Sequence, residues 1–549
     1  MSRRTADLLV DCLAGHGVDR VFCVPGESYL PVLDALRDRN DIETVVCRHE
    51  SGAGYMAVAD AKLTFRPGVC FVSRGPGAAN AAIAVHTAEQ DAVPFVLFIG
   101  QVPRHQLGRR AFQEVDYAKT FADMAKGVWT VHQAGQLPEI VARAFAVATS
   151  PTPGPVVVVL PEDVLDDMTD AAAIAPLPGP HIAAGEQEAA SIAKLVARAE
   201  RPLLIAGGGL AHAEGRAALL HAAEALQLPV VLSFKRQDLF ANNHPNYAGH
   251  LGFKIPRKHV ALLDRADLIL AIGTRLGEVT SQGYTFPAAP NPRQPLIHVH
   301  ADSAQLGRVY ACAQAITAEP ARFLRALARH AQPAPSGRGA WIADLHAYVA
   351  AQMPWRPPEA GVVMGSVAAA MAERLSEDAI LITDAGNFSG WLHRHFPFNG
   401  RHILLGAVGG AMGFGVPAAV AAGLRHREKD IVTWVGDGGF LMTGNELATA
   451  VKHGVRARIF IANNGSYGTI RMHQERAYPG RPAATDLVNP DFAKLAEAFG
   501  ARGLVVTREQ DVAGAVDEAL AHDGPVVVDM RTSVEQISAF ASLQEIAGR

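Results

Sequence analysis

Short apolar runs rich in valine and isoleucine recur along the whole chain, and each ends at glycine or polar residues before a helical pattern begins. Such runs are apolar on both faces, which is typical of buried strands in parallel sheets. The expected strands are 21–24, 44–47, 69–73, 95–99 and 156–160; 203–206, 230–233, 268–272 and 296–299; and 380–383, 403–405, 431–435, 459–462, 504–506 and 526–529. Helical stretches such as 139–148 and 446–452 alternate with them, so we expect α/β domains with doubly wound parallel sheets.

Two stretches rich in proline and glycine divide the chain of 549 residues into three segments. Residues 163–186 contain PLPGP and residues 332–360 contain PAPSGRG and PWRPPEA, a density that disfavours regular structure. We therefore expect domains at about 1–165, 185–335 and 355–549. The middle segment opens with a strand that runs into Gly207, Gly208 and Gly209. These glycines could place a helix N-terminus near a phosphate, but glycines are also common in the tight turns of α/β domains.

The composition excludes several classes of protein. With 49% hydrophobic and 19% charged residues, the chain is expected to fold rather than to be disordered. Its 50 basic and 54 acidic residues give a net charge of −4, too balanced to indicate a nucleic acid or an anionic membrane as partner. The five cysteines form no CxxC pair, and neither a signal peptide nor a membrane-spanning stretch is recognised, so we expect a cytoplasmic protein.

The sharpest chemical signal lies in the third segment. Strand 431–435 runs into Gly436-Asp437-Gly438-Gly439, and strand 459–462 ends at Asn463-Asn464. The 24 intervening residues, 439–462, fit one strand–helix–strand crossover, so both strand ends are expected at the same edge of the sheet. There a carboxylate and an amide oxygen can bind Mg²⁺, while glycine N–H groups approach a diphosphate. GDG alone is often a plain turn, but with Asn-Asn at this distance it predicts a metal and diphosphate site.

These residues resemble the metal–diphosphate motif of thiamine diphosphate enzymes, and the resemblance covers nearly the whole chain. The segments similar to the large catalytic subunit of acetolactate synthases are VFCVPGESYLPVLDAL, Arg48-His49-Glu50, SRGPGAAN, AFQEVDYAKT and GGAMGFGVPAA. The resemblance implies a pyrimidine-binding, a middle and a diphosphate-binding domain, in the order of the three segments. It also implies thiamine diphosphate and Mg²⁺ as cofactors, with the metal bound by Asp437, Asn464 and the backbone carbonyl of Ser466.

Glu50 follows the expected strand 44–47 and precedes a helix of small residues, and a strand end can present it to a ligand. A glutamate is also favoured in the first turn of any helix by the helix dipole. The resemblance implies that Glu50 is the catalytic carboxyl group, which bonds to N1′ of the pyrimidine and helps the cofactor to lose its C2 proton. Such a carboxyl shares a proton with a ring nitrogen in an apolar site, where burial favours its neutral form.

Further residues are assigned to cofactor binding by the same resemblance. Met412 would support the bent cofactor, although methionine also fills gaps in cores, and the backbone carbonyl of Gly410 would accept a hydrogen bond from its amino group. The turn Gly386-Asn387-Phe388 would hold the diphosphate through its backbone; the family often has Gln-His at its last two positions. The other expected cofactor-binding residues are Gly438, Gly439, Tyr467 and Gly468.

Substrate contacts are expected from three residues. Gln113, in AFQE, matches a residue that lines the active site in the family, and His86 is a candidate for substrate contact or proton transfer, although a lone histidine is more often structural. His473 stands where acetolactate synthases usually carry a tryptophan that shapes the acceptor pocket, and an imidazole is smaller and can form hydrogen bonds. Arg74 and Glu27 replace small residues of the family, and each either adds charge near the pocket or lies on the surface.

The sequence therefore predicts a thiamine diphosphate- and Mg²⁺-dependent enzyme that decarboxylates a 2-oxo acid such as pyruvate and joins the product to a second carbonyl compound. Simple non-oxidative decarboxylation, carboligation with another donor or acceptor, and a non-catalytic relative remain as alternatives; the last is disfavoured because Glu50, Asp437 and Asn464 are present. The resemblance implies a homodimer or homotetramer with sites at the subunit interface, and it allows a regulatory subunit. FAD is not favoured, because GTRLGEVTSQGYTF matches the family's FAD-binding stretch poorly.

Overall fold

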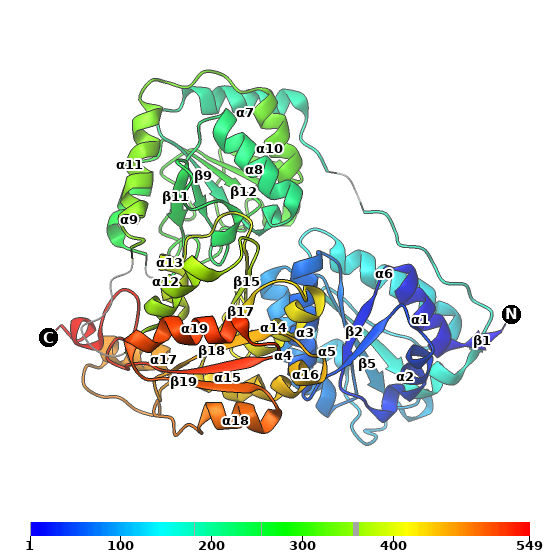
Figure 1. Ribbon diagram of the computed structural model, residues 1–549. Helices are drawn as coiled ribbons and strands as arrows, with labels where there is room; N and C mark the ends of the chain where they lie inside the picture. Colours follow the sequence, from blue (N-terminus) through cyan, green and yellow to red (C-terminus); the bar gives the residue numbers. More distant parts are fainter. Residues whose placement is uncertain (1, 180–181, 254, 355–361, 549) are drawn as a thin grey trace.

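Three α/β domains make up the chain, each with a six-stranded parallel sheet between helices (Figure 1). The computed structural model describes residues 2–179, 182–253, 255–354 and 362–548. The N-terminal domain (blue and cyan) lies beside the C-terminal domain (yellow to red), and the middle domain (green) sits above the C-terminal one in this view. The predicted fold class is thus confirmed. The expected domain start at residue 355 lies outside the described residues.

The N-terminal sheet has the strand order β3-β2-β4-β5-β7-β6, with all neighbouring strands parallel. Its strands are β2 Arg20–Cys23, β3 Glu43–Val46, β4 Gly68–Val72, β5 Phe95–Gln101, β6 Val128–Thr130 and β7 Pro155–Pro161. Its helices are α1 Thr5–Gly15, α2 Leu30–Arg37, α3 Glu50–Thr64, α4 Pro76–Asp91, α5 Tyr117–Thr120 and α6 Leu137–Thr149. The short strands β1 Arg3–Arg4 and β8 Met168–Thr169 form an antiparallel pair.

The C-terminal sheet repeats this order, counted along the chain, as β16-β15-β17-β18-β20-β19. Its strands are β15 Ile380–Thr383, β16 Ile403–Gly406, β17 Ile431–Gly436, β18 Ala457–Asn463, β19 Arg502–Val506 and β20 Val526–Arg531. Its helices are α12 Met364–Arg374, α13 Ser389–His395, α14 Gly415–Arg425, α15 Asp437–Thr443, α16 Leu447–Lys452, α17 Gly468–Ala477, α18 Phe492–Phe499, α19 Val512–Ala521 and α20 Leu543–Ile546. Strands β17 and β18 are parallel neighbours, as the crossover spacing predicts.

The middle sheet has a different order, β11-β10-β9-β12-β13-β14, in which the chain reverses direction across the sheet between β9 and β12, as in dinucleotide-binding folds. Its strands are β9 Pro202–Ala206, β10 Val230–Leu232, β11 Tyr247–His250, β12 Leu268–Ile272, β13 Leu296–His300 and β14 Gln314–Thr317. Its helices are α7 Glu186–Arg198, α8 Ala213–Ala225, α9 Arg257–Leu263, α10 Pro320–Arg329 and α11 Arg338–Ala350. A Cβ on Gly207 would lie 2.4 Å from the carbonyl oxygen of Gly273, so close packing of two strand-end turns explains this glycine.

The expected lack of regular structure is wrong in part for both proline- and glycine-rich stretches: residues 163–186 contain the short strand β8, and residues 332–360 are not irregular throughout. Helix α11 lies within this stretch, and its Trp341 and Leu345 are buried against the middle domain, where the Trp341 indole donates to the carbonyl of Pro202 at 3.0 Å. The prolines and glycines of this stretch flank the helix, so the apolar residues inside it outweigh them. No helix in the described part of the chain is long and apolar enough to cross a membrane.

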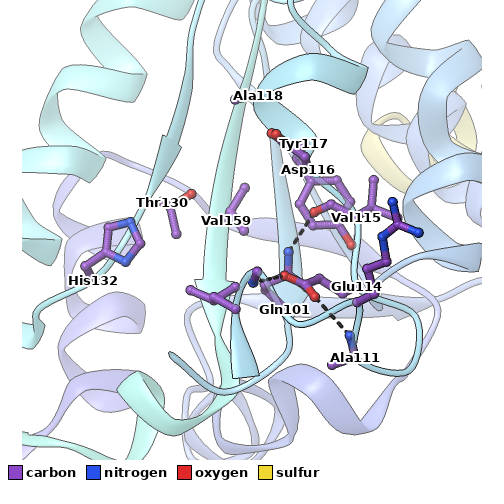
Figure 2. A pocket seen from close by; sticks show the side chains of 13 residues that line it. Gln101, Ala111, Glu114, Val115, Asp116, Tyr117, Ala118, Thr130, His132 and Val159 are labelled. Carbon is purple, nitrogen blue, oxygen red and sulfur yellow. Dashed lines mark hydrogen bonds between the residues drawn. The ribbon is translucent and has the colours of Figure 1, made fainter. Parts of the chain in front are cut away.

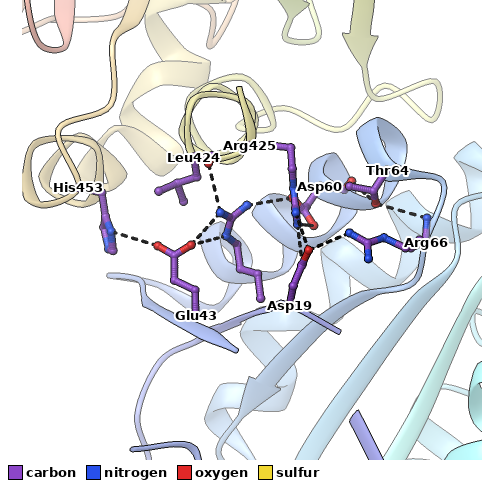
Figure 3. A network of polar contacts seen from close by, with 9 residues as sticks. Asp19, Glu43, Asp60, Thr64, Arg66, Leu424, Arg425 and His453 are labelled. Carbon is purple, nitrogen blue, oxygen red and sulfur yellow. Dashed lines mark hydrogen bonds and ion pairs between the residues drawn. The ribbon is translucent and has the colours of Figure 1, made fainter. Parts of the chain in front are cut away.

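The N- and C-terminal domains are joined by a shared core and by an ion network. Helix α3 packs on α14, and their buried residues belong to one apolar cluster that extends into both sheets. At the end of α14, Arg425 pairs with Asp19 at 2.9 Å and with Asp60 at 2.8 Å, both from the N-terminal domain (Figure 3). Arg20 of the N-terminal domain in turn donates to the carbonyl of Leu424 in the C-terminal domain at 3.2 Å. The hydrogen bonds from Arg425 hold the pKa of Asp19 well below its usual value.

Candidate active site

A cavity of about 270 Å³ lies at the carboxyl edge of the C-terminal sheet. Parallel α/β sheets commonly bind their ligands at this edge. The sequence-predicted residues that line it are Gly386, Asn387, Phe388, Gly410, Met412, Asp437, Gly438, Gly439, Asn464, Ser466, Tyr467 and Gly468. The structure thus brings together every cofactor-binding residue that was expected from the third segment.

Asp437 is the buried carboxylate of this cavity. It begins α15 directly after β17 and is 2% exposed. One of its oxygens, Oδ1, accepts from the N–H of Gly438 at 2.9 Å, and Oδ2 accepts from the N–H of Gly465 and from Asn489 Nδ2, both at 2.8 Å. Burial raises the pKa of Asp437 in spite of these donors. A cation bound here would therefore stabilise the charged carboxylate.

Asn464 and Ser466 add further oxygen atoms beside Asp437. The Asn464 side-chain oxygen accepts from the backbone N–H of Ser466 at 3.0 Å, which shapes the turn after β18. The Ser466 hydroxyl is buried and has no hydrogen-bond partner among the described residues. A carboxylate, an amide and a serine provide the hard oxygen ligands that Mg²⁺ prefers, so these residues fit the ion. No group of three or more His, Cys, Asp and Glu in the described ranges could hold a metal, so this site would rely on a single carboxylate.

Two glycines show how closely the backbone approaches the cavity. A Cβ on Gly438 would lie 2.6 Å from the ring of Tyr467, so a side chain at this position would displace that ring. Gly410 has φ +74°, a conformation that favours glycine, and a Cβ there would meet no atom within 4 Å. The first glycine allows close packing of the turn after β17. The second keeps the backbone open toward the cavity.

The turn after β15 is tied to the segment after β20. Asn387 donates from its side chain to the carbonyl of Ile537 at 2.6 Å, and its backbone N–H donates to Thr469 Oγ1 at 3.1 Å. Met412 is held by its carbonyl, which accepts from the Tyr55 hydroxyl of α3 at 3.2 Å. The carboxyl ends of β15, β18 and β20 are thereby fixed relative to one another around the cavity.

Glu50 lies outside this cavity. It is the first residue of α3, and its Oε2 accepts from Asn80 Nδ2 at 2.9 Å. Its Oε1 lies 3.3 Å from the position that a Cβ on Gly77 would occupy, so Glu50 faces the start of α4. All lining residues in the part of the chain that the structure describes belong to the C-terminal domain. Within one chain, the predicted catalytic carboxyl group is therefore not among the residues around the predicted cofactor site.

The three expected substrate contacts are also absent from the cavity lining. Gln113 has φ +64° and packs its backbone against Gly75, at the start of α4. His86 is half-buried on α4, and His473 is exposed on α17.

A larger hollow of about 620 Å³ adjoins the loop that carries Gln113 (Figure 2). It lies at the carboxyl edge of the N-terminal sheet, where Gln101 donates to the carbonyl of Val115 at 2.8 Å. Glu114 organises the loop by accepting from the N–H groups of Gly108 at 2.6 Å and Ala111 at 3.0 Å. The hollow contains none of the oxygen ligands described above, so the smaller cavity is the candidate cofactor site.

Arg74 and Glu27 form an ion pair on the same edge. Arg74 is 8% exposed and contacts Glu27 and Glu162, each at 2.7 Å. The Glu27 side chain is 74% exposed. Arg74 therefore does not lie on the surface, whereas Glu27 does, and the buried guanidinium of Arg74 holds this outward-facing carboxylate in place.

Several residues at the cavity were missed by the sequence analysis. Asn489 donates to both Asp437 and Asn463, and Thr469 bonds to Asn387. The segment after β20 contributes Thr532, Ser533, Gln536 and Ile537 to the lining. The position of this segment could have been found, because it follows a strand of the third set and strand ends meet at one edge. Asn489 lies 25 residues beyond Asn464 without any motif to mark it.

Comparison with known proteins agrees with this geometry. Family models for thiamine pyrophosphate enzymes match all three domains: the N-terminal TPP binding domain at residues 3–120, the central domain at 189–327 and the C-terminal TPP binding domain at 384–530. The acetolactate synthase large subunit of Parasynechococcus marenigrum is 33% identical over 542 residues, covering 96% of this chain and 87% of the relative. The acetolactate synthase isozyme 1 large subunit of Escherichia coli is 31% identical over 542 residues, covering 97% and 94%. The chain therefore belongs to the thiamine pyrophosphate enzyme family, and acetolactate synthase large subunits are among its relatives.

Proposed function

We propose that the protein is a thiamine diphosphate- and Mg²⁺-dependent carboligase, similar to acetolactate synthase, that decarboxylates a pyruvate-type 2-oxo acid. The observation that carries the proposal is the cavity in which Asp437, Asn464 and Ser466 place oxygen atoms together beside a glycine-rich turn. The identity of about 30% with acetolactate synthase subunits supports this reaction class.

Different residues of the chain would bind the metal and diphosphate and would orient the pyrimidine ring. Bound thiamine diphosphate supplies the nucleophilic carbon and accepts the electrons released with CO₂. Asp437, Asn464 and the carbonyl of Ser466 would hold Mg²⁺ against the diphosphate oxygens. Met412 and the open backbone at Gly410 would orient the pyrimidine ring, and Glu50 would bond to its N1′ and move a proton there.

The proposed assembly is a homodimer or homotetramer in which each site combines two chains. The support is that, within the described ranges, the cavity is lined by the C-terminal domain alone, while Glu50 lies apart from it. Three large apolar side chains are also about half exposed: Ile470, which lines the cavity, and Leu441 and Met442 of α15, the helix that begins at Asp437. A second chain that brought its Glu50 to the cavity would also cover them. Because the relatives are named large subunits, a regulatory subunit is a further possibility to test.

Simple decarboxylation, or carboligation with a different acceptor, is the second candidate function. Glu27 favours it, because Arg74 fixes an exposed carboxylate on the same sheet edge as Glu50 and Gln113. A negative charge near the acceptor would disfavour a second 2-oxo acid, which is itself an anion. Glu27, Gln113, His86 and His473 are the proposed candidates for acceptor selection.

Product analysis tests both functions. The protein is incubated with thiamine diphosphate, Mg²⁺ and pyruvate alone, and then with a panel of 2-oxo acids and paired acceptors. Acetolactate from pyruvate supports the first proposal, and an aldehyde or a mixed product supports the second. Absence of CO₂ release from every 2-oxo acid, in protein shown to bind the cofactor, would contradict both and favour a non-catalytic relative. The absorbance of the purified protein near 450 nm shows whether FAD is present.

A further inference from the structure

The loop that carries Gly410 and Met412, residues 406–414 and here called the cofactor loop, is held at its start by buried charges. Asp91, at the end of α4, accepts from two successive backbone N–H groups of the loop at 2.7 and 3.1 Å. Lys62 of α3 forms an ion pair with Asp91 and donates to the carbonyl of the first loop residue at 2.7 Å. Both side chains come from the N-terminal domain and are almost completely buried.

The middle domain reaches the same loop through Lys235. This residue follows β10, and its Nζ donates to the carbonyl of Ala407 at 2.9 Å. It is 4% exposed, and its φ of +54° lies in the left-handed region that a lysine rarely adopts. A strained backbone and a buried charge at one residue both cost free energy, and such features persist where the surroundings require them.

The charge of Lys235 is poorly compensated. No ion pair to it is formed by the described residues. The charged and titratable groups that face it are Asp91, Asp384, Lys62, Arg236 and His393. Burial lowers the pKa of Lys235 to about 8. Because the folded protein disfavours the charged form, protonated Lys235 lowers the stability of the fold at neutral pH, and this penalty disappears between pH 8 and 10.5.

We propose that Lys235 is a positioning residue for cofactor binding, through which the middle domain fixes the cofactor loop. By donating a hydrogen bond to the carbonyl of Ala407, Lys235 fixes the position of Gly410 and Met412 at the cavity. The middle domain contributes no side chain to the cavity lining that is described, so this contact gives it a role in a site built by another domain. The inference rests on the proposed function in so far as the cavity binds thiamine diphosphate.

The variant Lys235→Met removes the charge and keeps most of the buried volume, and Lys235→Arg keeps the charge. The matched control is Asn242→Ala, which breaks another contact between the middle and C-terminal domains: Asn242 accepts from the N–H of Phe398 at 3.2 Å, away from the cofactor loop. Thiamine diphosphate affinity is measured by titration in excess Mg²⁺, together with the thermal midpoint of each cofactor-free protein. Steady-state kinetics on a 2-oxo acid provide a third readout.

We expect Lys235→Met to weaken cofactor binding at least tenfold and to lower kcat, with KM for the 2-oxo acid changed less than threefold. Its cofactor-free midpoint should not fall below that of Asn242→Ala, because the burial penalty of the charge is relieved. Lys235→Arg should recover most of the affinity. Cofactor binding by the wild-type protein should weaken as the pH rises through about 8, and more steeply than binding by Lys235→Arg, in which Lys62 remains as the other buried lysine of lowered pKa on this loop.

Wild-type affinity in Lys235→Met would overturn the inference, as would an equal loss of affinity in Asn242→Ala. If Lys235→Met does not fold, the pH dependence of cofactor affinity in the wild type and in Lys235→Arg still decides, and identical profiles would overturn the inference. Failure of the wild-type protein to bind thiamine diphosphate would instead contradict the proposed function, so the two failures are distinguishable.

Discussion

The N- and C-terminal sheets have the same strand order, but the carboxylates at their carboxyl edges differ in exposure. In the C-terminal domain, the carboxylates Asp384 and Asp437 are 1% and 2% exposed and accept backbone N–H groups of their own domain. In the N-terminal domain, the Glu27 side chain is 74% exposed, and Glu50 contacts one side-chain amide. The C-terminal domain therefore forms an inward-facing site, whereas the N-terminal domain presents its side chains outward. The residues at the strand ends, and not the strand order, determine which role a domain has.

The largest effect is expected at the outward-facing edge. Glu50→Gln should bind thiamine diphosphate with nearly wild-type affinity but lose about 10²- to 10⁴-fold in activity, because an amide cannot transfer the proton. Exchange of the C2 proton of the bound cofactor for deuterium, followed by NMR, measures this step directly.

Glu27→Gln is the matched control for that variant, since it removes a carboxylate from the neighbouring strand end. The exchange rate should not change in the control. A wild-type exchange rate in Glu50→Gln would remove Glu50 from the proposed role, and a slow rate in both variants would point to the charge of the edge as a whole.

The second effect belongs to the inward-facing edge. Asp437→Ala should weaken Mg²⁺ and thiamine diphosphate together by about 100-fold, or about 2.7 kcal/mol, because the metal links protein and diphosphate. Since burial raises the pKa of Asp437 and the metal requires the ionised form, affinity for Mg²⁺ should fall as the pH is lowered. Ser466→Ala, which keeps the backbone carbonyl, should have a mild effect. Titration calorimetry showing normal cofactor affinity in Asp437→Ala would contradict the metal site.

Mixing these two inactive variants tests whether the edges meet across chains. A heterodimer of Glu50→Gln with Asp437→Ala has one intact combination of edges, so random exchange should restore about a quarter of wild-type activity. Each variant incubated alone is the control. Heterodimers demonstrated by mass spectrometry without any regained activity would place both edges of a site in one chain.

A smaller effect is expected at the joint between the two domains. Arg425→Met should lower the free energy of unfolding by roughly 1–3 kcal/mol, because the buried Asp60 loses its shorter ion pair and keeps the longer contact with Arg20, at 3.4 Å. The pKa of Asp19 is depressed by Arg425, so this contribution is present above about pH 4 and is lost as the pH falls further. Urea unfolding at pH 7, where the contribution is complete, and at about pH 2.5, where part of it is lost, measures both. An unchanged pH dependence in the variant would assign the stabilisation to other groups.

The smallest effect concerns the acceptor. His473→Trp should shift the product ratio toward acetolactate by a few-fold if a partner chain brings α17 beside the acceptor. A pocket with an imidazole disfavours an acceptor that leaves a buried polar group without a hydrogen bond, which costs about 1–3 kcal/mol, and an indole ring lessens this penalty. His473 is exposed in the single chain, so assembly must cover it for this to hold. Competition assays with paired acceptors measure the ratio, and an unchanged ratio in the loaded variant would assign His473 to the surface.

Most of the strands were predictable because buried parallel strands are continuous apolar runs. The short pair β1 and β8 was missed; in the three six-stranded sheets, all fifteen expected strands are present, whereas β6, β11 and β14 were missed. Each of these three lies at the edge of its sheet, and they are short: VWT, YAGH and QAIT. An edge strand is covered on fewer sides and needs fewer apolar residues, so its sequence gives a weaker signal.

The site was predictable where backbone and side chain act together at a strand end. The spacing of Asp437 and Asn464 identified the cavity, since a crossover fixes the distance between two strand ends. Asn489 and Lys235 were not found, because their contacts with Asp437 and Ala407 join segments that are far apart in the sequence. In the proposed assembly, the location of Glu50 relative to the cavity depends on a second chain, and a single sequence does not encode that contact locally.

The apolar cluster shared by α3 and α14 has a consequence for how this protein can evolve. Since the two outer domains bury one continuous core, neither can be deleted or exchanged for a homologous module without exposing the face of the other. The middle domain has cores of its own, so recombination can replace it with less disturbance. Recombination should therefore keep the first and third segments together as one unit, whereas the middle segment can be exchanged more readily as long as its contacts with the C-terminal domain, such as that of Lys235, are kept.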